Sequence, residues 1–275
     1  MVVNHRVTLI STVLNECAGL STWISAIDEQ SLQPDEIIIV DGGSTDGTLD
    51  LLRAWAGCRP DVVQVVAVPG ASISVGRNHA MQCATGDIIA VTDAGTIADL
   101  HWLEHLVRAF DDLTVDVVAG FWTVRRSSVW EHALAAATMP DCVDINPDAF
   151  LPSSRSVAFR RSWAHTGVRY PEWLDYCEDL IFDLSLLRAG AHVQFVRDAT
   201  VEFHVRPSAR SFWHQYRQYA RGDGKAGLFA KRHALRYITY GMLTATVVRQ
   251  RPVEWAVVAL AGAGYTSRAL RRMWR

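Results

Sequence analysis

Short runs of β-branched and aliphatic residues alternate with helix-like segments along the first half of the chain. The strand-like runs cover residues 6–12, 35–41, 62–68, 87–93 and 116–121, and the helix-like segments cover 18–30, 46–56, 75–84 and 102–110. Parallel strands need such crossover helices between them. The run 37–40 is apolar at every position, which indicates a strand covered on both faces. The pattern therefore predicts an α/β fold with a doubly wound, mixed but mostly parallel sheet.

The composition indicates a folded chain with reduced cysteines. Its 275 residues, 49% hydrophobic and 20% charged, can form one large domain with an appendage or two small domains. The five cysteines are far apart and include no C-x-x-C pair, which argues against a disulfide framework and against a zinc cluster. The N-terminal sequence "MVVNHRVTLISTVLNE" lacks the long apolar region and the small-residue cleavage site of a secretory signal. We therefore expect a cytoplasmic protein.

Two aspartates stand where strand-like runs end. Asp41 is followed by "GGSTDGT", and Asp93 is followed by "AGT". Ligands of doubly wound sheets bind just beyond the carboxyl ends of the strands, so we expect both carboxylates in one crevice. Gly43 and the glycines near it would let backbone N–H groups approach a ligand closely. The alternative is that both motifs are ordinary strand-to-helix turns.

The two common phosphate-binding loops, G-x-G-x-x-G after the first strand and G-x-x-x-x-G-K-[ST], are absent from the sequence. The motifs "ISTVLNE", "DEIIIVDGGSTDGT", "GRNHAMQCATGDIIAVTDAGT" and "CEDLIFDLSLLRAG" instead resemble those of the inverting family 2 glycosyltransferases with the GT-A fold. The resemblance covers roughly residues 5–220 and depends on the order and spacing of all the motifs. It implies a nucleotide-diphospho-sugar transferase-like catalytic domain over 1–225, with a nucleotide-binding half (1–100) and an acceptor half (101–225). Residues 226–275 would form a helical, basic and apolar appendage.

The resemblance also implies which residues bind the donor. These are Ser11, Val13, Asn15 and Glu16 around the base and ribose, Asp41 and Gly43 after the second strand, Arg77 over the base or diphosphate, Asp93, and the phosphate-neutralising Arg206, Arg217, Arg221 and Lys225. Asp41 would accept a hydrogen bond from a base N–H, which suits uracil or another pyrimidine best. Two alternatives stay open: Asn15 and Glu16 could simply begin a helix, and Arg77 could be a surface arginine on an amphipathic helix.

A divalent cation is implied at Asp93, which takes the place of the metal-binding acid of the D-x-D motif. Mn²⁺ or Mg²⁺ needs few protein ligands there, because water and phosphate oxygens fill the remaining positions. Gly95 stands where the family commonly has its second acid, so this chain offers one carboxylate fewer. His204 is a candidate further ligand, and the alternative for His204 is a strand-end histidine bonded to backbone.

The acids Glu178 and Asp179 open a segment whose apolar residues recur at helical spacing. Acids in a first helical turn are favoured by the helix dipole, so capping alone would explain them. The resemblance implies instead that the pair carries the catalytic base, Asp179 first and Glu178 second. Asp175 and Asp183 flank the pair at helix-like spacing and could take its place. It also implies that residues 153–155 approach the sugar and phosphates. Trp173 would offer a flat face to a sugar ring, or would be a core residue.

These features predict an inverting transferase that moves a sugar from a nucleoside diphosphate sugar, UDP-linked in the first instance, to a hydroxyl acceptor by single displacement. Two other classes stay open. A protein that binds a nucleotide sugar without turnover is favoured only by Gly95. A nucleotidyltransferase would need a glycine-rich loop with Arg and Lys after its first strand, and "STVLNECAGLS" has neither cation.

The charge is distributed unevenly along the chain. Residues 200–275 contain 14 Lys and Arg against 3 Asp and Glu, a net charge of +11, which leaves −13 for residues 1–199. The apolar stretches 234–248 and 253–267 are each shorter than the roughly 20 residues of a membrane-spanning helix. The two stretches could pair as a helical hairpin against the catalytic domain or lie in the membrane interface. We predict the second arrangement, with peripheral contact at the inner face of the cell membrane, where a glycan or lipid-linked sugar would be the acceptor. Nucleic acid binding by the interleaved aromatic and basic residues of 203–227 is the disfavoured interpretation.

Overall fold

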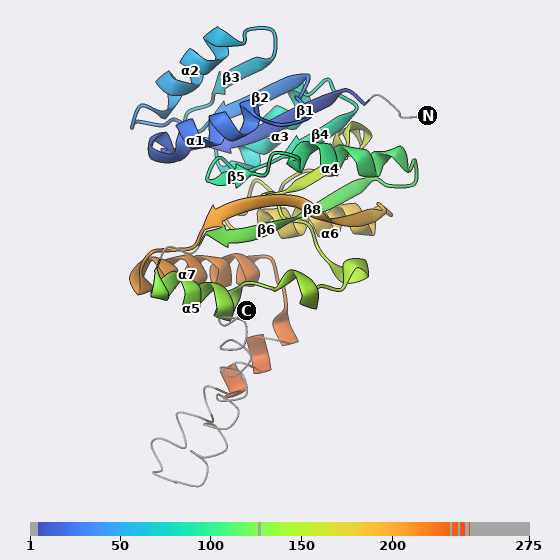
Figure 1. Cartoon of the computed structure of the whole chain (residues 1–275). Helices are drawn as coiled ribbons and strands as arrows, with labels where there is room; N and C mark the ends of the chain where they lie inside the picture. Colours follow the sequence, from blue (N-terminus) through green and yellow to red (C-terminus); the bar gives the residue numbers. More distant parts are fainter. Residues whose placement is uncertain (1–4, 126–127, 232, 236, 240–241, 243–275) are drawn as a thin grey trace. The chain divides into compact units, whose positions relative to one another are not determined.

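The computed structural model describes residues 5–125, 128–231, 233–235, 237–239 and 242 (Figure 1). The chain divides into two compact units. The first unit consists of residues 1–125 and 145–204, and the second unit consists of residues 126–144 and 205–275. Each unit is therefore assembled from two separate segments of the sequence. The expected division at residue 225 stays a prediction.

The first unit contains an eight-stranded mixed sheet with the strand order β3-β2-β1-β4-β7-β6-β8-β5. Its strands are β1 (Val7–Val13), β2 (Glu36–Asp41), β3 (Val63–Ala67), β4 (Ile88–Val91), β5 (Thr96–Ala98), β6 (Val117–Arg125), β7 (Val157–Arg160) and β8 (Val193–His204). The pairs among β3, β2, β1 and β4 are parallel, as is the pair β6–β8. The pairs β4–β7, β6–β7 and β5–β8 are antiparallel. The predicted mixed, mostly parallel sheet is confirmed.

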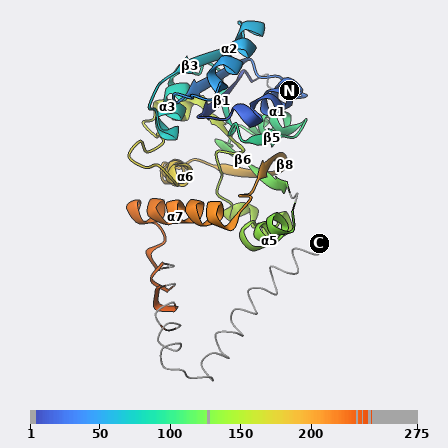
Figure 2. The same ribbon diagram turned by 90° about the vertical axis from the view of Figure 1, so that its left-hand side faces the viewer.

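Helices cover both faces of this sheet, and each face has its own hydrophobic core. On one face α1 (Cys17–Asp28), α2 (Thr48–Cys58) and α4 (Trp102–Arg108) pack against alternate strand residues that include Leu9 and Ile37. On the other face α3 (Ile73–Cys83) and α6 (Glu178–Arg188) pack against the intervening residues, which include Ile10 and Ile38 (Figure 2). Short 3₁₀ helices cover Ala109–Asp111, Pro147–Ala149 and Arg161–His165. Both faces are buried, as the apolar run 37–40 predicts.

The order of the central strands places the candidate site. Strands β2 and β4 lie on either side of β1 and run parallel to it, so their carboxyl ends meet at one edge. Asp41 is the last residue of β2, and Asp93 follows β4. Helix α3 approaches β1 closely because Gly76 has no side chain: a Cβ there would lie 2.6 Å from Thr12 Cγ2. Arg77, the next residue, reaches Asp93, which follows β4.

The second unit contains α5 (Val129–Thr138), a 3₁₀ turn (Cys142–Asp144) and α7 (Ala209–Lys225). Both α-helices begin with capping boxes, formed by Ser128 with Glu131 and by Ser208 with Ser211. The Trp130 ring of α5 meets the Phe212 ring of α7 edge-on, with centroids 6.5 Å apart. Within the described residues, no helix is long and apolar enough to cross a membrane. The predicted apolar stretches 234–248 and 253–267 lie outside the described residues, apart from 234–235, 237–239 and 242.

Candidate active site

Asp41 occupies a buried position at the carboxyl end of β2. Its Oδ1 accepts hydrogen bonds from the backbone N–H groups of Gly43 (2.9 Å) and Ser44 (3.0 Å). Gly43 has a φ of 103°, a conformation that favours glycine. The other carboxylate oxygen, Oδ2, is buried and has no hydrogen-bond partner among the described residues. Leaving such an oxygen without a donor costs about 1–3 kcal/mol, so Asp41 suits a ligand that brings an N–H or O–H group.

Asn15 ties the loop after β1 to the loop after β2. Its backbone, at a φ of 57°, donates to Ser44 Oγ (2.9 Å), and its side-chain Oδ1 accepts from the Thr45 N–H (2.9 Å). Glu16 precedes α1 without capping it through its side chain, and its N–H donates to Thr48 Oγ1 (2.9 Å). The pair therefore does more than begin a helix, because it fixes the loop that carries Gly43. Ser11 and Val13 are buried on β1.

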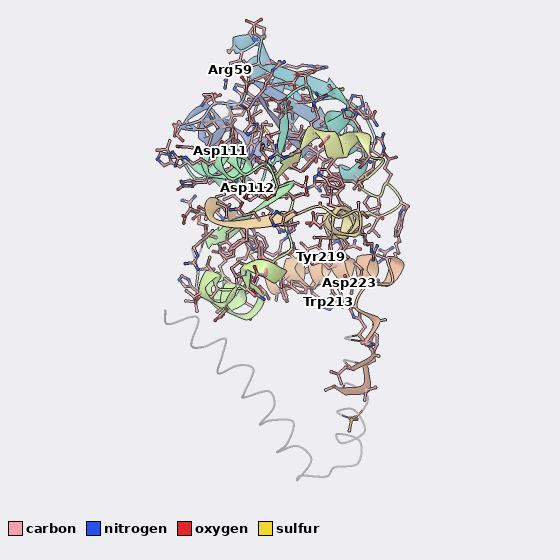
Figure 3. All side chains as sticks on the ribbon, turned by 90° about the vertical axis from the view of Figure 1, so that its right-hand side faces the viewer. Arg59, Asp111, Asp112, Trp213, Tyr219 and Asp223 are labelled. Atoms are coloured by element: carbon pink, nitrogen blue, oxygen red, sulfur yellow. The ribbon has the colours of Figure 1, made fainter. Side chains whose placement is uncertain are left out.

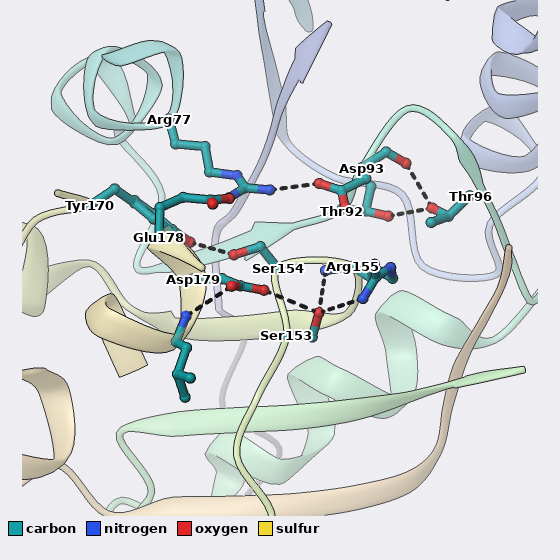
Figure 4. Close-up of polar contacts among 11 residues, drawn as sticks. Arg77, Thr92, Asp93, Thr96, Ser153, Ser154, Arg155, Tyr170, Glu178 and Asp179 are labelled. Carbon is teal, nitrogen blue, oxygen red and sulfur yellow. Dashed lines mark hydrogen bonds and ion pairs between the residues drawn. The ribbon is translucent and has the colours of Figure 1, made fainter. Parts of the chain in front are cut away.

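Arg77 joins the acids of two distant motifs (Figure 4). Its NH2 donates to Asp93 Oδ1 at 2.7 Å, and its NH1 donates to Glu178 Oε1 at 2.9 Å. The guanidinium carbon lies 5.1 Å from the centroid of the Tyr170 ring. Arg77 is only 2% exposed, so the interpretation as a surface arginine is wrong. Its contact with a base or diphosphate stays a prediction.

Burial and charge shift the pKa values in this cluster. Burial alone would lower the pKa of Arg77, but the negative charges around it, Asp93 first, raise it above its ordinary value. Burial raises the pKa of Glu178; the Arg77 charge opposes this shift and the Asp179 charge adds to it. Burial likewise raises the pKa of Tyr170. Arg77 is therefore permanently charged, and it holds an otherwise unfavourable acid cluster together.

Asp179 and Asp183 lie one turn apart on α6 and differ in accessibility. Asp179 is partly exposed, accepts from the Leu180 N–H at 2.9 Å, and meets Ser153 Oγ at 3.5 Å. Arg155 donates to the same Ser153 oxygen at 3.3 Å. Asp183 is buried, and its Oδ2 has no hydrogen-bond partner in the described part of the chain. Burial, followed by the Asp179 charge, raises the pKa of Asp183 well above its usual range. The accessible acid is Asp179.

Asn78, next to Arg77, anchors the loop that leads into α6. Its amide nitrogen donates to the Tyr170 carbonyl and to Glu172 Oε1, both at 2.9 Å, and its Oδ1 accepts from the Tyr170 N–H at 2.9 Å. Trp173, in this loop, is 59% exposed, so its interpretation as a core residue is wrong. Sequence reasoning missed Asn78 and Tyr170. The sequence "GRN" offered the one signal for Asn78, and Tyr170 had none.

A divalent cation would find a limited set of protein ligands at Asp93. One oxygen of its carboxylate is held by Arg77, and the side chain is 34% exposed. His204 is exposed and ends β8, directly after the Thr96–Phe203 pair of the β5–β8 ladder. A Cβ on Gly95 would meet no atom within 4 Å. No group of three or more His, Cys, Asp or Glu side chains among the described residues could hold a metal alone. The donor set fits Mn²⁺ or Mg²⁺ only if a ligand supplies further oxygens.

The predicted residues fall into both units. Ser11, Val13, Asn15, Glu16, Asp41, Gly43, Arg77, Asp93, Glu178, Asp179 and His204 lie in the first unit. Arg206 and Arg221 lie in the second unit, so their roles stay predictions. In the first unit, hydrogen bonds join Arg77 to Asp93 and Glu178, and Asn15 to the loop after Asp41.

A buried parallel sheet with acids at its carboxyl edge and helices on both faces defines an α/β protein that binds its ligand at the strand ends. The chain belongs to Glycosyl transferase family 2, whose model matches residues 8–159. The resemblance to the family is therefore confirmed. The match covers the first three motifs, whereas the fourth, at residues 177–190, lies outside it.

Relatives and solved structures agree with this family. The O-antigen chain rhamnosyltransferase RfbN of Salmonella typhimurium is 22% identical over 225 residues, which are 77% of this chain and 70% of the relative. An uncharacterized glycosyltransferase of Nostoc sp., alr2836, is 29% identical over 113 residues, or 41% of this chain. The chain spans 34% of the length of that protein and 38% of the length of the glycosyltransferase AglE from Haloferax volcanii.

Two solved structures show the same fold. The mannosyltransferase PcManGT from Pyrobaculum calidifontis, in complex with GDP-Man and Mn²⁺, aligns with a TM-score of 0.71 at 20% identity and covers 98% of this chain and 84% of its own. S. aureus TarS in complex with UDP-GlcNAc aligns with a TM-score of 0.60 at 17% identity and covers 79% of this chain and 66% of its own. The predicted GT-A fold is confirmed.

Proposed function

We propose that this chain transfers a sugar from a nucleoside diphosphate sugar to a hydroxyl acceptor with inversion at the anomeric carbon. The observation that carries the proposal is the pairing of Arg77 with both Asp93 and Glu178. This pairing joins the acid at the strand edge to the acid pair of α6 in one cluster. A site for sugar transfer needs both parts, one for the leaving diphosphate and one for the acceptor proton.

The donor side centres on Asp41. Its buried Oδ2 has no donor among the described residues, and Ser11 Oγ on β1 is a second buried oxygen without a partner there. A base with a ring N–H would satisfy Asp41, and we infer uracil as that base, with a UDP sugar as the donor. Asp93 would face the diphosphate. A bound Mn²⁺ or Mg²⁺ would neutralise charge on the leaving diphosphate, held by Asp93 and, in the Mn²⁺ case, by His204.

On the acceptor side, Asp179 is the proposed base. It would take the proton of the acceptor hydroxyl while that oxygen bonds to the anomeric carbon and the carbon–oxygen bond to the diphosphate breaks, with the electron pair leaving on the diphosphate. Asp179 suits this role better than Glu178 because Glu178 is buried and held by Arg77. Asp183 is buried away from an acceptor. Exposed Trp173 would contact the acceptor sugar through its ring face.

Thermal shift with a panel of nucleotides tests the donor site. We expect UDP to raise the melting temperature more than GDP, dTDP or CDP, with a further rise on adding Mn²⁺. Asp41→Asn should lose most of the nucleotide effect, and Asp93→Asn should lose the Mn²⁺ increment only. Asp50→Asn, an exposed acid on α2, is the matched control and should behave as the parent. Absence of any nucleotide effect on the parent protein would overturn the proposal.

Binding without turnover is a second candidate, favoured by Gly95 in place of an acid. The open space around Gly95 allows Gly95→Asp without a clash at Cβ. If the chain is a transferase with a weak metal site, Gly95→Asp should strengthen the Mn²⁺ dependence of UDP-sugar turnover, and Gly95→Asn should not. If neither the parent nor Gly95→Asp releases UDP from a UDP sugar in the presence of an acceptor, the binding-only alternative is favoured.

A further inference from the structure

Three arginines and a tryptophan lie along one side of α7, in the second unit. Arg210, Trp213, Arg217 and Arg221 recur every three or four residues of this helix, and all of them are exposed. The Arg217 guanidinium lies 5.9 Å from the Trp213 ring, which is itself 58% exposed (Figure 3). Phe212, on a neighbouring side of the helix, meets Trp130 of α5 instead. The α7 helix therefore has one side that packs on α5 and another that presents positive charge beside an indole.

A row of aliphatic side chains follows α7 in the sequence. Leu235, Ile238 and Met242 are 66%, 58% and 65% exposed, and their spacing places them on one side of a helix. Thr239 Oγ1 donates to the Leu235 carbonyl at 2.8 Å, as expected in helical backbone. Solvent exposure of several large aliphatic side chains at helical spacing marks a surface that binds something apolar.

The net positive charge of residues 205–242 limits which class of partner can bind this part of the chain. Residues 205–242 contain eight Lys and Arg and a single acid, Asp223. Asp223 is buried and meets His233 at 3.1 Å, so it does not offset the cations of the exposed row. The partner must therefore combine negative charge with hydrocarbon.

We propose that the arginines of α7 (Arg210, Arg217 and Arg221) and the aliphatic row (Leu235, Ile238 and Met242) bind the surface of an anionic lipid bilayer. The arginines would meet the headgroups, Trp213 would lie at the interface, and the aliphatic row would reach the boundary of the acyl chains. A single-stranded nucleic acid would also meet cations and an indole, but it has no use for Leu235, Ile238 and Met242. The proposal does not depend on sugar transfer, since it concerns a different unit of the chain.

Co-sedimentation of the full chain with vesicles tests the proposal. One vesicle contains phosphatidylcholine alone, and the other contains phosphatidylcholine mixed with phosphatidylglycerol. We expect binding to the anionic vesicle that falls as salt rises, and weak binding to the neutral vesicle. The variant Arg210→Gln/Arg217→Gln should bind the anionic vesicle about tenfold more weakly or worse.

Matched variants distinguish the contribution of the arginines to vesicle binding from the contribution of the aliphatic side chains. Leu235→Ser/Ile238→Ser should also weaken binding, whereas Arg53→Gln/Arg197→Gln and Leu113→Ser, exposed residues of the first unit, should not. Unchanged circular dichroism melting would show that each variant is folded. Equal sedimentation with both vesicles, or a loss in the first-unit controls equal to that in the α7 variant, would overturn the proposal. So would tight binding of a single-stranded oligonucleotide that is insensitive to Leu235→Ser/Ile238→Ser.

Discussion

The core of the first unit and the α7 surface of the second unit differ in how their tryptophans and arginines are placed. In the first unit, Trp55, Trp102 and Trp163 donate their indole N–H groups to Asp28, Ser156 and Asp116. In the second unit, Trp213 projects from α7 with more than half of its surface exposed. The first unit also encloses its central cation, Arg77, between carboxylates, whereas the second unit leaves Arg210 and Arg217 exposed.

This difference indicates that the two units have different functions. A site that moves a proton and a sugar needs fixed groups, and packing with satisfied hydrogen bonds fixes them. A surface that binds a fluid, anionic lipid bilayer needs accessible cations and apolar groups instead. Substitutions in the buried cluster of the first unit should therefore act on chemistry and folding stability, and substitutions of the exposed Arg210 and Trp213 of α7 should act on neither.

The largest expected effect is on turnover. Asp179→Asn should lower kcat roughly 10²–10⁴-fold, because it removes the proposed base while keeping the size of the side chain. Nucleotide binding, read by thermal shift, should stay near that of the parent. Arg210→Gln in the second unit, assayed with a water-soluble acceptor, should keep the parental kcat. If Asp179→Asn keeps its turnover and Glu178→Gln loses it, the base is Glu178.

The second-largest expected effect is on the free energy of unfolding. Arg77→Met should lower the free energy of unfolding by about 3–5 kcal/mol, because Glu178 would remain buried and Asp93 would remain in place without their cation. Urea unfolding followed by circular dichroism measures this difference. Arg53→Met, at an exposed position of α2, is the control and should change the value by less than about 0.5 kcal/mol. A loss below about 1 kcal/mol for Arg77→Met would mean that the acids are protonated without it.

The sheet and the start of α6 were predictable because local patterns determine them. The run 37–40 is apolar at every position, which is typical of a strand covered on both faces, and turn residues bound it on the C-terminal side. Glu178 and Asp179 are the first residues of α6, where the helix dipole favours acidic side chains. Asp41 and Asp93 were expected at one edge because parallel strands end together.

The burial of Arg77 could not be predicted in the same way. Its partner Glu178 is 101 residues away in the sequence, and no local pattern distinguishes a buried arginine from an exposed one on a helix. Strands β5, β7 and β8 were not predicted either, since β5 and β7 are short and all of them pair antiparallel to a neighbour far along the chain. The second unit joins 126–144 to 205–275, which no composition boundary marks.

Asp183 should make stability depend on pH. Its pKa is raised in the folded state by burial and by Asp179, so the folded protein binds the proton more tightly than the unfolded chain. The parent should therefore lose stability as pH rises above the usual Asp value of about 3.9, and the loss should level off above the raised folded pKa.

Asp183→Asn removes this titration, so its stability should exceed that of the parent by an amount that grows with pH across the same window. Urea unfolding at a series of pH values measures the difference between the two proteins. Asp50→Asn should run parallel to the parent throughout. A gap between Asp183→Asn and the parent that narrows with rising pH would show that Asp183 is ionised and stabilising.

The smallest expected effect is the change in the free energy of unfolding on a substitution in the second unit. Trp213→Ala should change the free energy of unfolding by less than about 0.5 kcal/mol, because its exposed ring loses little contact on truncation. Trp102→Ala should cost about 3–5 kcal/mol, because it empties a buried site and leaves Ser156 Oγ without its indole donor. Urea unfolding of the two variants side by side tests the contrast. A Trp213→Ala cost as large as that of Trp102→Ala would mean that the α7 surface is packed in solution, which would remove the physical basis for a lipid-facing second unit.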